Sequence, residues 1–210
     1  MSCSLVCISR ASGAGGEEVG RLVAERLGFL FVDEELISRA AARGGIDPET
    51  VADVENRKPM FAGLLDYLGE GGAVLATAPL APRGAEPPSE VVRAFIRDAI
   101  HEVAERGNAV IVAHAASYAL GANDQTLRVL ITASPQTRSK RLAAADGLGE
   151  KEDARTIRRS DAERVDYLKR FYKVGQELPI HYDLVINTDM LSIDQASALI
   201  VQAATDQPPR

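Results

Sequence analysis

The sequence predicts an α/β protein built on a parallel sheet, and three observations lead to this prediction. Five short apolar runs are continuous rather than alternating, as in strands that are covered on both faces. Helical patterns separate these runs, which indicates βαβ units with right-handed crossovers. A glycine-rich turn joins the first run to the first helical pattern. With 210 residues, the chain is long enough for one such domain with a full core.

The apolar runs give the expected strands, at residues 5–9, 29–32, 109–113, 127–132 and 184–187. Apolar residues at helical spacing give the expected helices, at residues 16–27, 89–106 and 192–204. A long insertion separates the second and third strands. It begins with a helical pattern at 35–42, a second helix is indicated near Asp47, and four prolines make 77–90 a loop or linker.

Composition excludes several classes of function. The formal net charge of −6 argues against a dedicated binder of nucleic acid or of anionic membranes, although a small anionic ligand needs only local positive charge. No apolar run reaches the length of a membrane span, and the N-terminus lacks the features of a signal peptide, so we expect a cytoplasmic protein.

The two cysteines, Cys3 and Cys7, fall in or next to the first expected strand. Their Cα atoms would lie about 13 Å apart in a strand, which is too far for a disulfide. We interpret both as buried small apolar groups. No further metal ligands accompany them, so no metal site is predicted.

The glycine-rich turn resembles a phosphate-binding loop that has lost its lysine. The usual pattern is G-x-x-x-x-G-K-[ST], in which the lysine reaches the β- and γ-phosphates and the hydroxyl holds Mg²⁺. Here Arg10 stands at the first glycine, Gly16 at the lysine and Glu17 at the hydroxyl residue. The candidate loop residues are Arg10, Ser12, Gly13, Ala14, Gly15, Gly16 and Glu17.

Backbone geometry can keep this loop functional without the lysine. A strand that enters a glycine-rich turn and then a helix directs N–H groups and the positive helix end at one point. The glycines permit positive φ and close backbone approach. Arg10 could replace part of the lysine's charge, whereas Glu17 would help a phosphate only through Mg²⁺. The alternative is a glycine-rich turn that binds nothing.

Longer segments carry a resemblance to a known family. The segment ISRASGAGGEEVGRLVAERLGFLFVDEELISRAA resembles the opening of the cytidylate kinase-like family of P-loop proteins, whose loop typically reads S-R-x-x-G-S-G-G. The likeness resumes at NAVIVAHAASYAL, LRVLITASPQTRSKRL, RRSDAERVDYLKRFY and YDLVINTDMLSIDQASALI. It covers most of the chain except roughly residues 57–90.

The resemblance implies a single P-loop kinase-like domain over residues 1–210, with an α/β nucleoside-kinase fold. It implies a five-stranded parallel sheet of order 2-3-1-4-5 flanked by helices, a helical acceptor-binding insertion at 34–107 and a lid at 146–175. It also implies ATP as the donor, Mg²⁺ as the metal cofactor and a pyrimidine monophosphate, CMP or dCMP, as the acceptor.

The resemblance also implies an acceptor pocket of Asp33, Arg39, Arg93 and His114. Asp33 ends the second strand, Arg39 and Arg93 match arginines that grip the acceptor phosphate, and His114 stands where the family has arginine. A neutral imidazole lacks the fork and the fixed charge of guanidinium. The alternatives are a helix N-cap for Asp33, a solvated helix face for the two arginines and a strand-end cap for His114.

The implied lid carries a D-x-x-R motif at Asp161 and Arg164. Arg158 precedes it at helical spacing, and we favour it over Arg159 as the family's preceding arginine. These three residues are the expected catalytic groups, because lid arginines neutralise a transferring phosphate. The alternative is a solvated helix that carries pairs of opposite charge.

Two functions therefore follow from the sequence. One is a nucleoside monophosphate kinase-like enzyme. The other is a catalytically weak or inactive nucleotide-binding regulatory module, which the missing loop lysine and His114 favour. The sequence leaves the true acceptor and the oligomeric state open, a homo-oligomer included.

Overall fold

The computed structural model describes residues 3–33, 90–113, 115–146 and 150–206. Its centre is a five-stranded parallel sheet of order β2-β3-β1-β4-β5. The strands are β1 (Leu5–Arg10), β2 (Leu30–Asp33), β3 (Ala109–Val112), β4 (Thr126–Thr132) and β5 (Leu184–Asn187). The predicted strand order is confirmed, and each strand begins and ends within one residue of its expected bounds.

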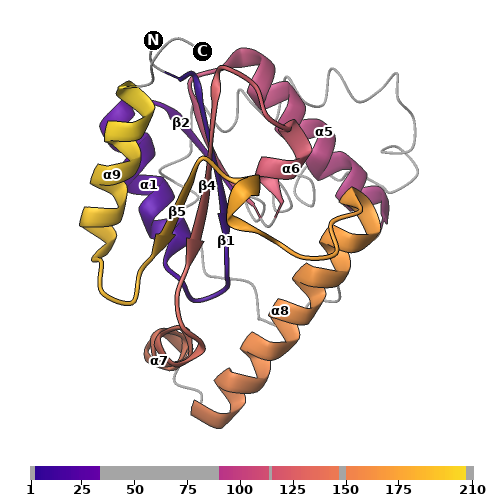
Figure 1. The fold of residues 1–210 in the computed structure, drawn as a ribbon, viewed down its shortest axis with the longest axis vertical. Helices are drawn as coiled ribbons and strands as arrows, with labels where there is room; N and C mark the ends of the chain where they lie inside the picture. The colour runs from indigo at the N-terminus through magenta and orange to yellow at the C-terminus, as the bar shows by residue number, and fades with distance from the viewer. Residues whose placement is uncertain (1–2, 34–89, 114, 147–149, 207–210) are drawn as a thin grey trace.

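Helices cover both faces of this sheet (Figure 1). Those that the sequence predicts are α1 (Gly16–Leu27), α5 (Glu90–Arg106) and α9 (Ile193–Thr205), and the lid motif with its helical spacing lies in α8 (Glu150–Tyr172). Those it did not predict are α6 (Ala116–Leu120), α7 (Pro135–Asp146) and the 3₁₀ turn η1 (Pro179–His181). Helices α1 and α9 pack together on one side of the sheet, while α5 and α6 contact β3 and β1.

The strands are buried along most of their length, which explains their continuous apolar sequences. Ile8 of β1, Ile111 of β3 and Ile131 of β4 are fully buried. Cys3 and Cys7 are free and buried, as expected from the sequence. Burial raises the pKa of the Cys7 thiol to about 12, so this side chain stays a neutral apolar group.

Helix α1 begins and ends at glycines. Gly15 at its N-cap and Gly28 at its C-cap both have left-handed backbone conformations, and the Gly28 N–H donates to the carbonyl groups of Ala24 and Glu25. This C-terminal arrangement satisfies helix carbonyl groups that lack an internal partner. The N-terminal glycine leaves the first turn of α1 without a side-chain cap, at the end that faces β1.

The strand register brings the carboxyl ends of the strands to one edge of the sheet. Asp33 pairs with Val112, Arg10 with Ile131, and Thr132 with Asn187, so the carboxyl ends of neighbouring strands meet there. Strand β1 lies in the middle, between β3 and β4, and the glycine-rich turn leaves its carboxyl end. Ligands of open parallel sheets bind at such a position, where the order of strands reverses.

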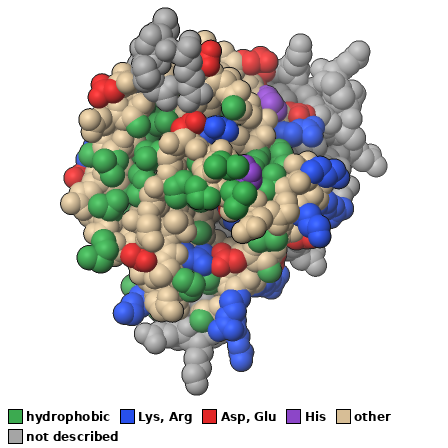
Figure 2. Space-filling view, in the orientation of Figure 1, with side chains coloured by type: hydrophobic (Ala, Val, Ile, Leu, Met, Phe, Trp, Pro, Cys, Tyr) green, Lys and Arg blue, Asp and Glu red, His purple; other side chains and the backbone are tan. Residues whose placement is uncertain are grey.

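The face shown in Figure 2 has hydrophobic side chains at its centre and Lys and Arg side chains toward its right and lower edges. Exposed apolar residues of the region after α8 include Leu178, Ile180 and Val185. No helix in the described ranges is both long enough and apolar enough to cross a membrane. Within the predicted lid, the structure describes α8 and the residues after it up to 175; most of the predicted acceptor insertion lies outside the described residues.

Candidate nucleotide-binding site

The glycine-rich loop connects β1 to α1 through two left-handed glycines. Gly13 has φ +77° and Gly15 has φ +82°, values that favour glycine over any residue with a Cβ atom. Gly15 is also the N-cap of α1 and makes no side-chain hydrogen bond there. The positive end of α1 therefore opens directly onto the loop.

Close packing holds the loop in this shape. A Cβ atom added to Gly13 would lie 2.9 Å from the carbonyl oxygen of Arg138 on α7, and one added to Gly16 would lie 2.6 Å from the Cβ of Arg10. Both distances are shorter than normal van der Waals contacts. Gly13 is thus required by its neighbours and by its backbone conformation, and Gly16 by its neighbours alone.

Three arginines hold the carbonyl groups of the loop. Arg138 donates to Ser12 O at 3.3 Å, Arg141 donates to Ala14 O at 3.2 Å, and Arg164 donates to Arg10 O at 3.0 Å. A trans peptide directs its C=O and the next N–H to opposite sides. The amides that follow Ser12 and Ala14 therefore point away from these guanidinium groups. The three guanidinium groups also add positive charge around the loop.

Arg141 joins the loop to the end of β5. It donates to the Thr188 Oγ1 at 2.8 Å and to the Thr188 carbonyl at 2.7 Å, and the Thr188 hydroxyl in turn donates to Ala14 O at 2.8 Å. Thr188 is fully buried. Sequence reasoning missed Arg138, Arg141 and Thr188. The signal for the two arginines was their spacing of three, just after the strand that ends at Thr132.

A small cavity of about 120 Å³ opens at the loop. It is lined by Arg10, Ala11, Gly13, Gly15, Gly16, Glu17, Glu18, Arg141 and Leu142. Arg10 and Glu17 form an ion pair. Most predicted loop residues thus share one cavity. Ser12 is the exception among the polar ones, because its hydroxyl bonds to that of Ser160 on α8 at 2.6 Å.

The three residues predicted as catalytic have different contacts on α8, although Arg158 and Asp161 line one cavity. Asp161 accepts from the Arg138 guanidinium, with one bond of 2.8 Å. Arg164 is only 8% exposed and bonds Glu177 through two nitrogens, at 3.0 and 2.6 Å. Arg158 is exposed and lines a cavity of about 360 Å³ between α7 and α8. The structure thus joins Asp161 and Arg164 to the loop, and leaves Arg158 apart from it.

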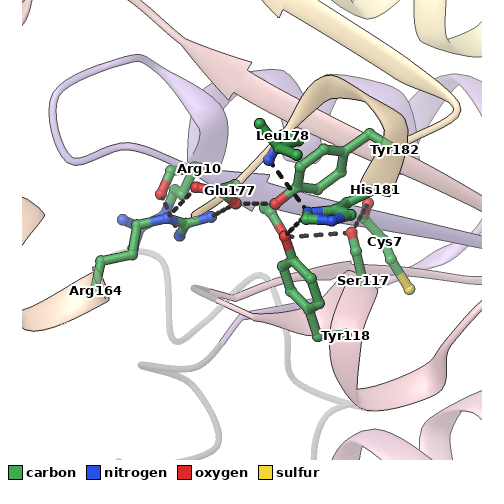
Figure 3. Close-up of polar contacts among 10 residues, drawn as sticks. Cys7, Arg10, Ser117, Tyr118, Arg164, Glu177, Leu178, His181 and Tyr182 are labelled. Carbon is green, nitrogen blue, oxygen red and sulfur yellow. Dashed lines mark hydrogen bonds and ion pairs between the residues drawn. The ribbon is translucent and has the colours of Figure 1, made fainter. Parts of the chain in front are cut away.

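Glu177 is the centre of the network drawn in Figure 3. It accepts from Arg164 and from the Tyr182 hydroxyl, so its carboxylate joins α8 to the segment before β5. Since Arg164 also bonds the Arg10 carbonyl, one guanidinium connects this segment to the end of β1. Sequence reasoning missed Glu177, which lies in a segment without periodic pattern.

A second part of this network packs the same segment on α6. The Tyr118 hydroxyl lies 2.8 Å from Nδ1 of His181, and the Leu178 N–H donates to the same nitrogen at 3.2 Å. A backbone N–H can only donate, so Nδ1 is the acceptor and the neutral ring carries its proton on Nε2. Burial, aided by the charge of Glu177, raises the pKa of Tyr118 to about 12. Tyr118 therefore keeps its proton at neutral pH.

The predicted acceptor residues are described only in part. Asp33 ends β2, is 4% exposed and has Arg21 of α1 within 3.5 Å. Arg39 and His114 lie outside the described residues, and of Arg93 the structure gives only its place in α5. Asp33 thus stands at the expected edge of the sheet, while the grouping of the four residues stays a prediction.

Comparison with known proteins identifies the family. The model of the cytidylate kinase-like family matches residues 5–190. The chain belongs to the cytidylate kinase-like family. Its relatives include a cytidylate kinase from Rhodococcus opacus, 24% identical over 98% of this chain and 96% of that protein. Another is a cytidylate kinase from Aeropyrum pernix, 32% identical over 49% of this chain and 59% of that protein.

Solved structures show the same fold. An uncharacterized protein from Eubacterium ventriosum superimposes with a TM-score of 0.68 at 18% identity, covering 97% of this chain and 99% of that one. A shikimate kinase from Acinetobacter baumannii superimposes with a TM-score of 0.50 at 15% identity, covering 94% of this chain and 90% of that one. The predicted α/β fold of the P-loop kinases is thereby confirmed.

Proposed function

We propose that this protein is a nucleoside monophosphate kinase-like enzyme of the cytoplasm that transfers the γ-phosphate of ATP to CMP or dCMP. Family membership supports the reaction class. The observation that carries the proposal is the loop itself, at the carboxyl end of the central strand, with three arginines on its carbonyl groups. That arrangement directs the following amides and the positive end of α1 at a phosphate.

The loop fits the phosphates of ATP on a structural test. Cβ atoms at Gly13 or Gly16 would collide with Arg138 or Arg10, so only glycines let the loop keep the tight shape that surrounds the cavity. Glu17 and Glu18 line the same cavity and would offer carboxylates to a Mg²⁺ ion held on the phosphates. Mg²⁺ held by these carboxylates would supply positive charge that offsets the negative charge of the phosphates.

The acceptor and lid residues take the roles that the family implies. We assign Asp33, Arg39, Arg93 and His114 to the acceptor, and Arg158, Asp161 and Arg164 to the lid. Asp33 supports this through its place at the carboxyl edge of the sheet, where it pairs with Val112 of β3. Arg164 already contacts the loop through Arg10 O, so a shift of α8 would move its charge relative to the bound phosphates.

A second candidate function is a nucleotide-binding module with little or no turnover. Two observations favour it. Gly16 stands where the loop lysine is expected, and the Arg164 guanidinium is already engaged by Glu177 and by Arg10 O. A protein with these features would bind ATP through its loop and use the bound state as a signal.

One assay separates the two functions. The protein is incubated with ATP and Mg²⁺, together with CMP, dCMP, UMP or AMP in turn, and ADP and nucleoside diphosphate are both quantified. The kinase proposal expects equal amounts of the two products with CMP or dCMP, and an Arg39→Ala variant with a raised acceptor KM. ATP binding without acceptor-dependent ADP release for any of the four would replace the kinase by the binding module.

A further inference from the structure

We propose that Arg10 supplies the positive charge of the missing loop lysine. Gly16 has no side chain and so leaves room for the Arg10 side chain, and Glu17 holds the Arg10 guanidinium at the cavity. This inference rests on the proposed nucleotide site and names the side chain that gives this site its charge. The inference concerns nucleotide binding. It can therefore be wrong while the proposed kinase reaction is right, and it can be right while the kinase reaction is wrong.

Space at the start of α1 is the first observation. A Cβ atom at Gly16 would lie 2.6 Å from the Arg10 Cβ and 3.0 Å from its Cδ. Gly16 is the first residue of α1 and is not among the positive-φ glycines, so its backbone would accept a lysine. The stem of Arg10 therefore fills the space in which a lysine side chain would begin. A lysine at 16 and an arginine at 10 exclude each other.

Charge at the cavity is the second observation. The side chain of Arg10 is 18% exposed, and it lines the same cavity as the loop glycines and Glu17. Its Nε is buried and has no hydrogen-bond partner within the described part of the chain. A buried donor without a partner is costly, and a phosphate oxygen in the cavity is an acceptor of the right chemistry.

The backbone of Arg10 is also held in place. Arg10 is the last residue of β1 and pairs with Ile131 of β4, while its carbonyl accepts from the largely buried Arg164. Its stem thus starts from a rigid position, and Glu17 orients its far end. Such preorganisation reduces the entropy that is lost when an anion binds.

The test is a side-chain exchange measured by calorimetry, with ATP and with inorganic triphosphate, in buffer that contains EDTA. Arg10→Met should weaken binding of both probes about 10-fold or more, as expected for a lost charge-assisted contact. Gly16→Lys should also weaken binding, because the lysine meets the Arg10 stem. The double variant Arg10→Gly/Gly16→Lys should regain most of the lost affinity, because it restores the usual loop pattern.

Arg26→Met is the matched control. Arg26 also pairs with a carboxylate, that of Asp194, but it lies at the end of α1 opposite the loop. Its binding should equal that of the parent. Glu17→Gln provides an independent measurement, because it removes the ion-pair partner of Arg10 without touching the loop backbone. If Glu17 holds the Arg10 guanidinium at the cavity, Arg10→Met should weaken triphosphate binding less in the Glu17→Gln background than in the parent, and an equal loss in both backgrounds would overturn this role of Glu17.

The results that overturn the proposal are equally defined. They are parent-like binding by Arg10→Met or by Gly16→Lys, a double variant no better than Arg10→Met, or a parent protein that binds neither probe. A parent protein that binds ATP but transfers no phosphate would end the kinase proposal and leave this test intact.

Discussion

At the scale of single residues, the role that the family resemblance implies for Arg164 differs from the contacts that this side chain makes in the structure. The family resemblance assigns it to the transferring phosphate, whereas in this structure it bonds Glu177 and the Arg10 carbonyl and is almost fully buried. A buried guanidinium that loses its partners is expensive, and so is the carboxylate left behind. Its contribution to stability can therefore be measured separately from any contribution to turnover.

We expect Arg164→Ala to lower the free energy of unfolding by about 2 kcal/mol, because Glu177 would lose its charged partner. Urea denaturation measures this loss. Arg159 provides the control, since it is an exposed arginine of the same helix that pairs with Glu163, and its replacement by alanine should cause no measurable loss. Equal stability of the two variants would show that the buried contacts of Arg164 do not support the fold.

Tyr118 predicts a pH dependence of stability. Its pKa is raised from 10.0 to about 12, so the folded state holds the phenolic proton more tightly than the unfolded state does. Between these two pH values the unfolded chain binds fewer protons, and stability falls as pH rises through this window. Tyr118→Phe should make the fall less steep.

Thermal melts of both proteins at several pH values between 10 and 12 test this expectation. The same pair at pH 7 is the control, because it reports the hydrogen bond to His181 without the titration. If the two curves stay parallel across the alkaline window, Tyr118 does not contribute to the alkaline loss of stability.

At the scale of elements, α7 decides the shape of the glycine loop. Its first turn is stabilised by Ser134, whose hydroxyl accepts from the Thr137 N–H at 3.3 Å. From this fixed start α7 presents the Arg138 carbonyl to Gly13 and the Arg138 and Arg141 guanidinium groups to the loop carbonyls. The loop is thus supported by an element more than one hundred residues away in the sequence.

Substitutions at two glycines with similar backbone angles can show how strongly α7 constrains the loop. Gly13 and Gly28 have φ of +77° and +67°, but of these two only Gly13 has neighbours, among the residues that the structure describes, within 4 Å of an added Cβ atom. Gly28→Ala should cost about 1 kcal/mol from its backbone conformation alone. Gly13→Ala should cost clearly more in urea denaturation and should also weaken ATP binding, because α7 must move. Similar losses for both would mean that α7 does not constrain the loop.

At the scale of the whole molecule, nucleotide binding should raise thermal stability. Near 100 times Kd, a ligand that binds only the folded state adds about 2.7 kcal/mol, and each kcal/mol shifts Tm by about 2–4 °C in a domain of this size. We therefore expect ATP to raise Tm by about 5–10 °C in a thermal shift assay. Adenosine is the control, because it keeps the base and sugar of ATP without the phosphates, and an equal shift with it would place the binding energy outside the loop.

The fold was largely predictable because its signals are local. Continuous apolar runs located the strands to within one residue, and the apolar stripe between Gly16 and Leu27 gave α1 with its observed bounds. Helix α7 was not predicted, because most of its residues are polar or small and form no clear apolar stripe. The five-residue helix α6 and the turn η1 are too short to show a period at all.

The sequence by itself determined that a parallel sheet leads into a bare glycine loop at the start of a helix, since apolar runs and glycines act on the backbone nearby. Only the tertiary structure decided which of the many arginines reach that loop. Arg138 and Arg141 of α7 and Arg164 of α8 do so, whereas Arg158 and Arg159 on the same α8 are exposed, and Arg159 pairs with Glu163 of its own helix. Charged side chains of one type look alike in a sequence, and the packing of distant elements selects their partners.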